Sequence, residues 1–80
     1  MTNLEKYNEI FADVFAVEQA EFNDSFSREN VKNWDSIHQL NLISYIEDEF
    51  DIMFDAEDSL SLISYNRGIE ILSNKYGIKF

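Results

Sequence analysis

Apolar residues recur at spacings of three and four positions over much of this 80-residue chain, which is the spacing of one face of an α-helix. Near the start, this stripe consists of Leu4, Tyr7, Phe11 and Val14. Thr2 is followed three residues later by Glu5, a pair whose side chains can cap a helix reciprocally. The pattern therefore predicts a first amphipathic helix that begins after Thr2 and ends near Phe15.

The helical spacing fades over residues 16–35, where turn-forming residues accumulate. These are Asn23, Asp24, Ser25, Ser27 and Asn30. A connection of roughly 20 residues is unusually long for a compact domain, and such connections are functional or held down by their own side chains. Three apolar residues interrupt the polar run and are expected to pin the loop: Phe22, Phe26 and Val31. Trp34 follows at the exit of the loop.

Two further helices are predicted in the middle of the chain. The second helix runs from about Ser36 to Phe50, and the carboxylate of Asp35 is well placed to cap its first turn. A short third helix starts after Asp55, which we expect to cap it, with Asp58 in the first turn. Acidic residues are favourable there because the amino end of a helix carries a partial positive charge.

The fourth predicted helix runs from about Ser64 to Tyr76. Its apolar stripe is Tyr65, Ile69, Leu72 and Tyr76. Lys75 suits the negative end of the helix dipole, and Gly77 provides the stop. Gly68 costs about 1 kcal/mol relative to Ala inside a helix, and a close approach of another helix would explain it. Residues 1–80 are thus expected to form a single all-α domain, a small four-helix bundle with three main helices, a short third helix and a long loop between helices one and two.

The second predicted helix has apolar residues on two opposite faces. One face carries the expected core residues, which are Leu42, Ile43, Ile46 and Phe50. Ile37 lies about 180° from Ile46 on a helical wheel, and Leu40 is nearer to Ile37 than to the core stripe. Their side of the helix is otherwise polar and acidic, with Asn41, Ser44, Glu47 and Asp48. Apolar side chains surrounded by charge are typical of a protein-binding patch; alternatively, the bundle wraps both faces, or the exposed residues have no special role.

The composition narrows the possible functions. The chain has 16 acidic and 6 basic residues, a formal net charge of -10, and no cysteine. Without cysteine it has no disulfide, cysteine zinc site or thiol nucleophile of its own. Its charge should repel phosphate backbones and anionic membrane surfaces, so we expect basic protein partners, no nucleic acid and no membrane. With neither a signal peptide nor a membrane-spanning run apparent, a cytoplasmic monomer is expected.

Ser36 is the candidate for modification. It occupies the first turn of the second predicted helix, directly after the long loop and the capping Asp35. The free backbone N–H groups and the helix dipole at this end favour a phosphate group attached to its hydroxyl. The alternative, and the commoner case for a serine at a helix start, is a role in capping alone.

These residues resemble the acyl carrier protein family over almost the whole chain. Trp34-Asp35-Ser36-Ile37 stands where the family has an Asp-Ser-Leu tripeptide whose serine carries 4′-phosphopantetheine. The segment 42–50 is similar to the family's apolar helix that ends in an acidic cluster and Phe. The preceding helix and long loop, and the short acidic and final amphipathic helices, also fall where the family has them.

The resemblance implies a non-catalytic carrier. Ser36 would receive 4′-phosphopantetheine, derived from coenzyme A, from a phosphopantetheinyl transferase, and the cofactor thiol would hold an acyl or aminoacyl group as a thioester. Asp35 would cap the helix and contact partners, which are acyl- or aminoacyl-activating and transferring enzymes with basic docking surfaces. The positions that match the family's recognition helix are Ile37, Leu40, Asn41, Glu47 and Asp48. Leu42, Ile43 and Ile46 would belong to the core and line a cavity for an acyl chain.

Several positions depart from the pattern of fatty-acid carriers. They are Asn33, Trp34, His38, Asn41 and Tyr45. The Trp-Asp-Ser form resembles stand-alone carriers that serve special pathways, such as polysaccharide decoration, polyketide starters or aminoacyl transfer. The departures therefore favour a specialised biosynthetic pathway over the housekeeping fatty-acid enzymes. The acidic stretch over residues 47–58 is expected to flank Ser36, where basic enzymes would dock.

Other chemistries fit the sequence less well. Asp35, Ser36 and His38 do not predict a hydrolase, because residues two apart on a helix do not face each other. His38 is instead expected to be a solvated or partner-contacting residue. Apolar residues 52–54 interrupt any calcium-binding loop register in the acidic stretch, although weak binding of divalent cations there stays open. The main alternative is a small acidic interaction or regulatory module in which Ser36 stays unmodified.

Overall fold

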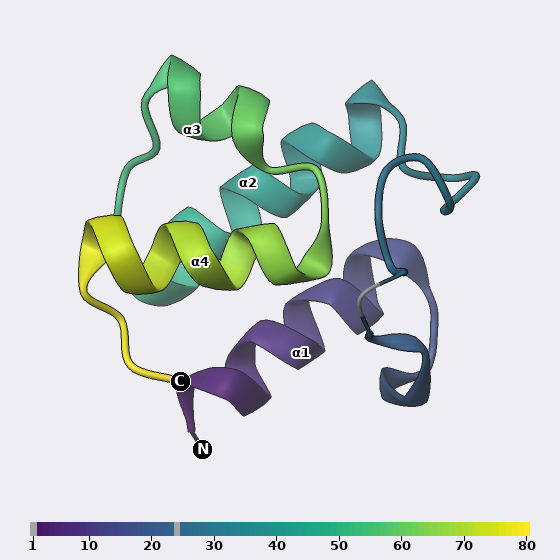
Figure 1. The fold of residues 1–80 in the computed structure, drawn as a ribbon, viewed down its shortest axis with the longest axis horizontal. Helices are drawn as coiled ribbons and strands as arrows, with labels where there is room; N and C mark the ends of the chain where they lie inside the picture. Colours follow the sequence, from purple (N-terminus) through teal and green to yellow (C-terminus); the bar gives the residue numbers. More distant parts are fainter. Residues whose placement is uncertain (1, 24) are drawn as a thin grey trace.

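The computed structural model describes residues 2–23 and 25–80, and these residues form four α-helices and no β-strand. The helices are α1 (Asn3–Phe15), α2 (Ser36–Phe50), α3 (Ala56–Ser61) and α4 (Tyr65–Tyr76), with a 3-10 turn η1 (Gln19–Glu21) after α1. In Figure 1, α4 lies in front of α2, with α3 and α1 at opposite edges. The all-α prediction and the long loop between the first two helices are confirmed. Asp24, one of the predicted turn formers, lies outside the described residues.

The helix ends follow local sequence signals. Thr2 and Glu5 form the predicted capping box, with both bonds between side chain and backbone at 3.1 Å. Asp55 caps α3 by accepting from the backbone N–H of Asp58 at 2.8 Å, as predicted. Ser64 caps α4 in the same way, and Gly77 ends that helix with a φ of 68°, a conformation that glycine adopts without strain.

The face of α1 that is buried differs in part from the predicted stripe. Tyr7 and Phe11 are buried as predicted, but Leu4 is exposed and Val14 is only partly buried. Ile10 and Phe15 are buried instead. The physical reason is that α1 packs against both α2 and an aromatic cluster built by the loop, which moves the buried face toward positions 10 and 15. On α4, Ile71 is likewise buried while Ile69 and Tyr76 are half-buried.

Aromatic rings fill the centre of the molecule. The ring of Phe11 lies within about 6 Å, centroid to centroid, of six other aromatic rings, which are Tyr7, Phe15, Phe22, Phe26, Trp34 and Tyr65. Three of these rings come from the loop, where Phe26 and Trp34 are buried and Phe22 is half-buried. The loop is therefore held down by its own side chains, as the sequence predicted, with Trp34 as an additional contact.

Gly68 lies where α1 and α4 come together. A Cβ atom at this position would lie 2.0 Å from the hydroxyl oxygen of Tyr7 and 3.0 Å from a methyl carbon of Leu62. The Tyr7 hydroxyl is buried and donates a hydrogen bond of 2.6 Å to the carbonyl oxygen of Tyr65. The close helix approach predicted for Gly68 is thus present, and a buried tyrosine hydroxyl occupies the space.

Candidate functional site

The candidate site is the amino end of α2, where Asp35 forms the cap. Its Oδ1 atom accepts a 2.9 Å hydrogen bond from the backbone N–H of His38, and this bond lowers the pKa of the Asp35 carboxyl. The carboxylate is exposed and stays ionised through the neutral range. Ser36 is exposed at the first position of α2, immediately beside this cap.

His38 reinforces the same cap. Its Nδ1 atom lies 2.8 Å from Asp35 Oδ1. The same carboxylate oxygen therefore accepts from the backbone N–H of His38 and lies within hydrogen-bond distance of its ring. The ring also stacks on Phe15 at the end of α1, with an interplanar angle of 13° and 5.9 Å between centroids. His38 was expected to be a solvated or partner-contacting residue; its side chain is 30% exposed and also contacts Asp35 and Phe15. Its described bond goes to Asp35, an arrangement unlike a serine–histidine nucleophile pair.

A buried polar network centred on Gln39 connects the first turns of α2 to the loop exit and to the end of α3. Gln39 is 9% exposed, and its amide nitrogen donates to the carbonyl oxygens of Ser59 and Leu62, each at 3.0 Å. The amide oxygen of Gln39 accepts from the indole N–H of Trp34. Sequence reasoning missed this network, and the available signal was a lone glutamine on the core side of α2.

Apolar side chains project into solvent next to Ser36. Ile37 and Leu40 are 69% and 65% exposed, so the interpretation that the bundle wraps this face of α2 is wrong. Asn41 is exposed on the same face. The structure adds two exposed apolar residues from the α3 region, Leu60 at 76% and Ile63 at 47%. Ile37 and Leu40 thus form an apolar surface at the start of α2, while Leu42 and Ile46 are fully buried in the core and Ile43 packs partly against it.

Glu47 and Asp48 lie at the opposite end of α2 from Ser36, so this part of the acidic stretch does not flank Ser36 as expected. Glu47 follows Ser36 by 11 positions, which corresponds to about 17 Å along the helix axis. Its half-buried carboxylate accepts a 2.8 Å bond from the backbone N–H of Phe54 and so fixes the turn after α2. Asp48 is exposed. A partner that contacts both Ser36 and Asp48 would therefore span most of the length of α2.

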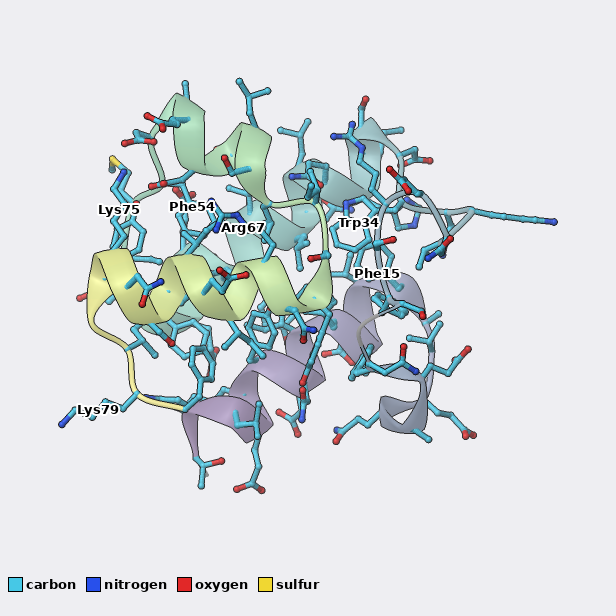
Figure 2. All side chains as sticks on the ribbon, in the orientation of Figure 1. Phe15, Trp34, Phe54, Arg67, Lys75 and Lys79 are labelled. Carbon is cyan, nitrogen blue, oxygen red and sulfur yellow. The ribbon has the colours of Figure 1, made fainter. Side chains whose placement is uncertain are left out.

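Part of the acidic stretch is neutralised within the fold. Asp58 is 6% exposed and pairs with Lys75, whose ammonium also lies 2.6 Å from Asp55. Tyr76 donates a further hydrogen bond to Asp58. Figure 2 shows Lys75 at the far end of the molecule from Trp34, which directly precedes Asp35 and Ser36. This cluster joins α3 to α4, and of its two carboxylates Asp58 is buried while Asp55 stays exposed.

Tyr45 joins α2 to α1. Its hydroxyl donates a 2.9 Å hydrogen bond to the carboxylate of Asp13, and this bond raises the pKa of the Tyr45 hydroxyl. Tyr45 is larger than the residue usual at this position of the family's recognition helix. In this chain its hydroxyl connects α2 to α1 through Asp13.

Comparison with models of known protein families and with curated proteins found no match. Within residues 2–23 and 25–80, no cluster of three or more histidine, aspartate or glutamate side chains is arranged to hold a metal ion. None of the helices that the structure describes has the length and apolar character needed to cross a bilayer.

Proposed function

We propose that this chain is an acyl carrier protein in which Ser36 carries 4′-phosphopantetheine. The observation that carries the proposal is the placement of Ser36: an exposed hydroxyl at the first position of a firmly capped helix, beside the exposed apolar residues Ile37 and Leu40. A transferase needs access to the hydroxyl, and partner enzymes need a surface next to it. Both are available at the start of α2.

The residues around Ser36 suit a phosphodiester. The dipole at the amino end of α2 favours a negatively charged group beside the cap, where Asp35 already accepts from the backbone N–H of His38. In the attachment step, the Ser36 oxygen forms a bond to the phosphorus of the coenzyme A pantetheine phosphate. The bond from that phosphorus to 3′,5′-adenosine bisphosphate breaks, and the serine proton passes to a base on the transferase. When bound, the cofactor supplies the thiol that this cysteine-free chain lacks and that forms thioesters.

The chain's own residues then position and present the carried group. Asp35 and His38 fix the first turn of α2, and Ile37 with Leu40 offers apolar contacts to a partner. Exposed carboxylates such as that of Asp48 favour enzymes with basic surfaces, because complementary charge speeds weak and reversible encounters. Trp34 donates its indole N–H to Gln39 in the buried network, and the sequence Trp34-Asp35-Ser36 is the feature that favours a carrier in a specialised pathway.

The test is transfer from coenzyme A by a broad-specificity phosphopantetheinyl transferase, read by intact-protein mass. The wild-type chain is expected to gain the mass of one 4′-phosphopantetheine group. Ser36→Ala should gain nothing, while the control Ser44→Ala, which removes another exposed hydroxyl from α2, should be modified like wild type. An unmodified wild-type chain, or a modified Ser36→Ala chain, would overturn the proposal and favour an acidic interaction module.

A further inference from the structure

Both hydrogen bonds between His38 and Asp35 use the same carboxylate oxygen. The backbone N–H of His38 donates to Oδ1 at 2.9 Å, and the ring Nδ1 lies 2.8 Å from that atom. Because an ionised carboxylate accepts hydrogen bonds and donates none, the ring proton must be on Nδ1. Neither bond uses Oδ2, and the Asp35 side chain is 57% exposed. The carboxylate is therefore held through one oxygen without being covered.

The His38 ring is itself fixed by the end of α1. It stacks on Phe15, which is buried. Phe15 packs in turn against Trp34, with 4.9 Å between ring centroids, and its carbonyl oxygen accepts a 3.2 Å bond from the Asn33 side chain. Figure 2 shows Phe15 and Trp34 at the same end of the molecule. The end of α1 and the loop exit thus form a platform that sets the direction in which the His38 ring points.

The cap of α3 shows how a cation binds to an aspartate of this kind. Asp55 Oδ1 accepts from the backbone N–H of Asp58, and its Oδ2 lies 2.6 Å from the ammonium of Lys75. One oxygen of Asp55 thus caps the helix and the other binds a cation from the same chain. At Asp35, the ion pair made within the described residues is with His38 and uses Oδ1. Oδ2 of Asp35 is therefore the oxygen left for a cation from another molecule.

We propose that His38 is a positioning residue for the attachment reaction: it orients the Asp35 carboxylate so that Oδ2 meets a lysine or arginine of the transferase. The inference rests on the proposed function and names a further residue that this reaction needs. Since Ser36 directly follows Asp35, a cation bound to Oδ2 holds the transferase next to the hydroxyl that it modifies. The ring of His38 helps because the carboxylate is already ordered before the transferase binds, and ordering side chains is part of the cost of association.

Two substitutions separate the hydrogen-bond donor of His38 from its ring. His38→Asn keeps an N–H donor on a short side chain but removes the ring, whereas His38→Phe keeps a ring that can stack on Phe15 but has no donor. Initial rates of transfer from coenzyme A would be measured at varied carrier concentration. His38→Phe should raise the KM for the carrier about two- to tenfold at unchanged kcat, the factor expected for ordering one side chain at an interface. His38→Asn should raise it less. An unchanged KM in His38→Phe, or an equal or larger increase in His38→Asn, would overturn the proposal.

A double-mutant cycle tests whether His38 acts through Asp35. Asp35→Asn keeps a side chain that can cap a helix but removes the negative charge that attracts a cation. In that background, His38→Phe should have no further effect on KM. The full increase in KM there would mean that His38 contacts the transferase directly, which would overturn the positioning role. A wild-type chain that the transferase does not modify would instead overturn the proposed function, and the role of His38 with it.

The pKa of the Asp35 carboxyl in the unmodified protein tests the same contact without the transferase. The backbone bond from His38 is the larger cause of the lowered pKa, and the side-chain bond from His38 adds to it. Both variants keep the backbone bond. An NMR titration of the ¹³C-labelled carboxyl should therefore give a higher pKa for Asp35 in His38→Phe than in wild type, with His38→Asn between the two. An unchanged pKa in His38→Phe would show that the ring does not hold the carboxylate, and it would overturn the proposal even if the chain is modified at Ser36.

Discussion

Gly68→Ala should destabilise the fold although alanine is the better helix former. The new Cβ atom would sit 2.0 Å from the buried hydroxyl of Tyr7, which is far inside contact distance. Overpacking of a core costs about 1–3 kcal/mol. Displacing the hydroxyl also leaves the buried carbonyl of Tyr65 without its donor, at about 1–3 kcal/mol. Set against a gain in helix propensity of about 1 kcal/mol, these two costs give a net loss of about 1–5 kcal/mol.

Urea unfolding followed by circular dichroism would measure this loss as a change in midpoint at constant slope. The matched control is Ser73→Ala, an exposed position on the same helix that should be neutral or slightly stabilising. A double-mutant cycle with Tyr7→Phe isolates the clash, because removing the hydroxyl removes the nearest atom. Gly68→Ala should cost less in the Tyr7→Phe background. A neutral or stabilising Gly68→Ala in wild type, or an equal cost in both backgrounds, would refute the reasoning.

Three further predictions concern the α2 face, its anchor and the α3–α4 cluster. Ile37→Ala should change the free energy of unfolding by less than about 0.5 kcal/mol, whereas Ile46→Ala should cost about 2–5 kcal/mol in the same urea assay; equal costs would contradict the exposed placement of Ile37. Gln39→Leu should cost about 2–5 kcal/mol, because buried partners lose their bonds; a stable variant with unchanged tryptophan fluorescence would contradict the network. The hydrogen bond from Lys75 lowers the pKa of Asp55 in the folded protein. The stabilisation from this pair is therefore present above the pKa of Asp55 in the unfolded chain, and it is lost as the pH falls through the lower pKa of Asp55 in the folded protein. Lys75→Met should therefore flatten the fall in Tm between about pH 5 and pH 2, and an unchanged profile would count against the pair.

Local signals made most of the helix boundaries predictable from sequence. Four helices begin with a capping residue, which is Thr2, Asp35, Asp55 or Ser64. Each cap accepts from the backbone N–H three positions later, so it can be recognised from a short stretch of sequence. The opposed apolar faces of α2 follow from helix geometry alone, which explains why Leu42 and Ile46 are buried while Ile37 is exposed.

Contacts between distant segments were not predictable in the same way. The stacking of His38 on Phe15 depends on where the loop returns the chain, and the partners of Gln39 are 20 and 23 positions away. The burial of Asp58 was not predictable, because its partner Lys75 lies on another helix. The position of Glu47 is a different case. The rise per residue in a helix already places it about 17 Å from Ser36, so charge concentration in sequence was a poor guide to position in space.

The most direct test of the account is to locate the modification by fragmenting the protein after incubation with coenzyme A and a phosphopantetheinyl transferase. Ser25, Ser36, Ser44 and Ser73 are among the exposed serines, so total mass alone does not identify the acceptor. The account predicts that the added group is found on Ser36 and on no other residue. A chain that stays unmodified, or one modified at any other serine, would contradict the claim that the start of α2 is a cofactor attachment site.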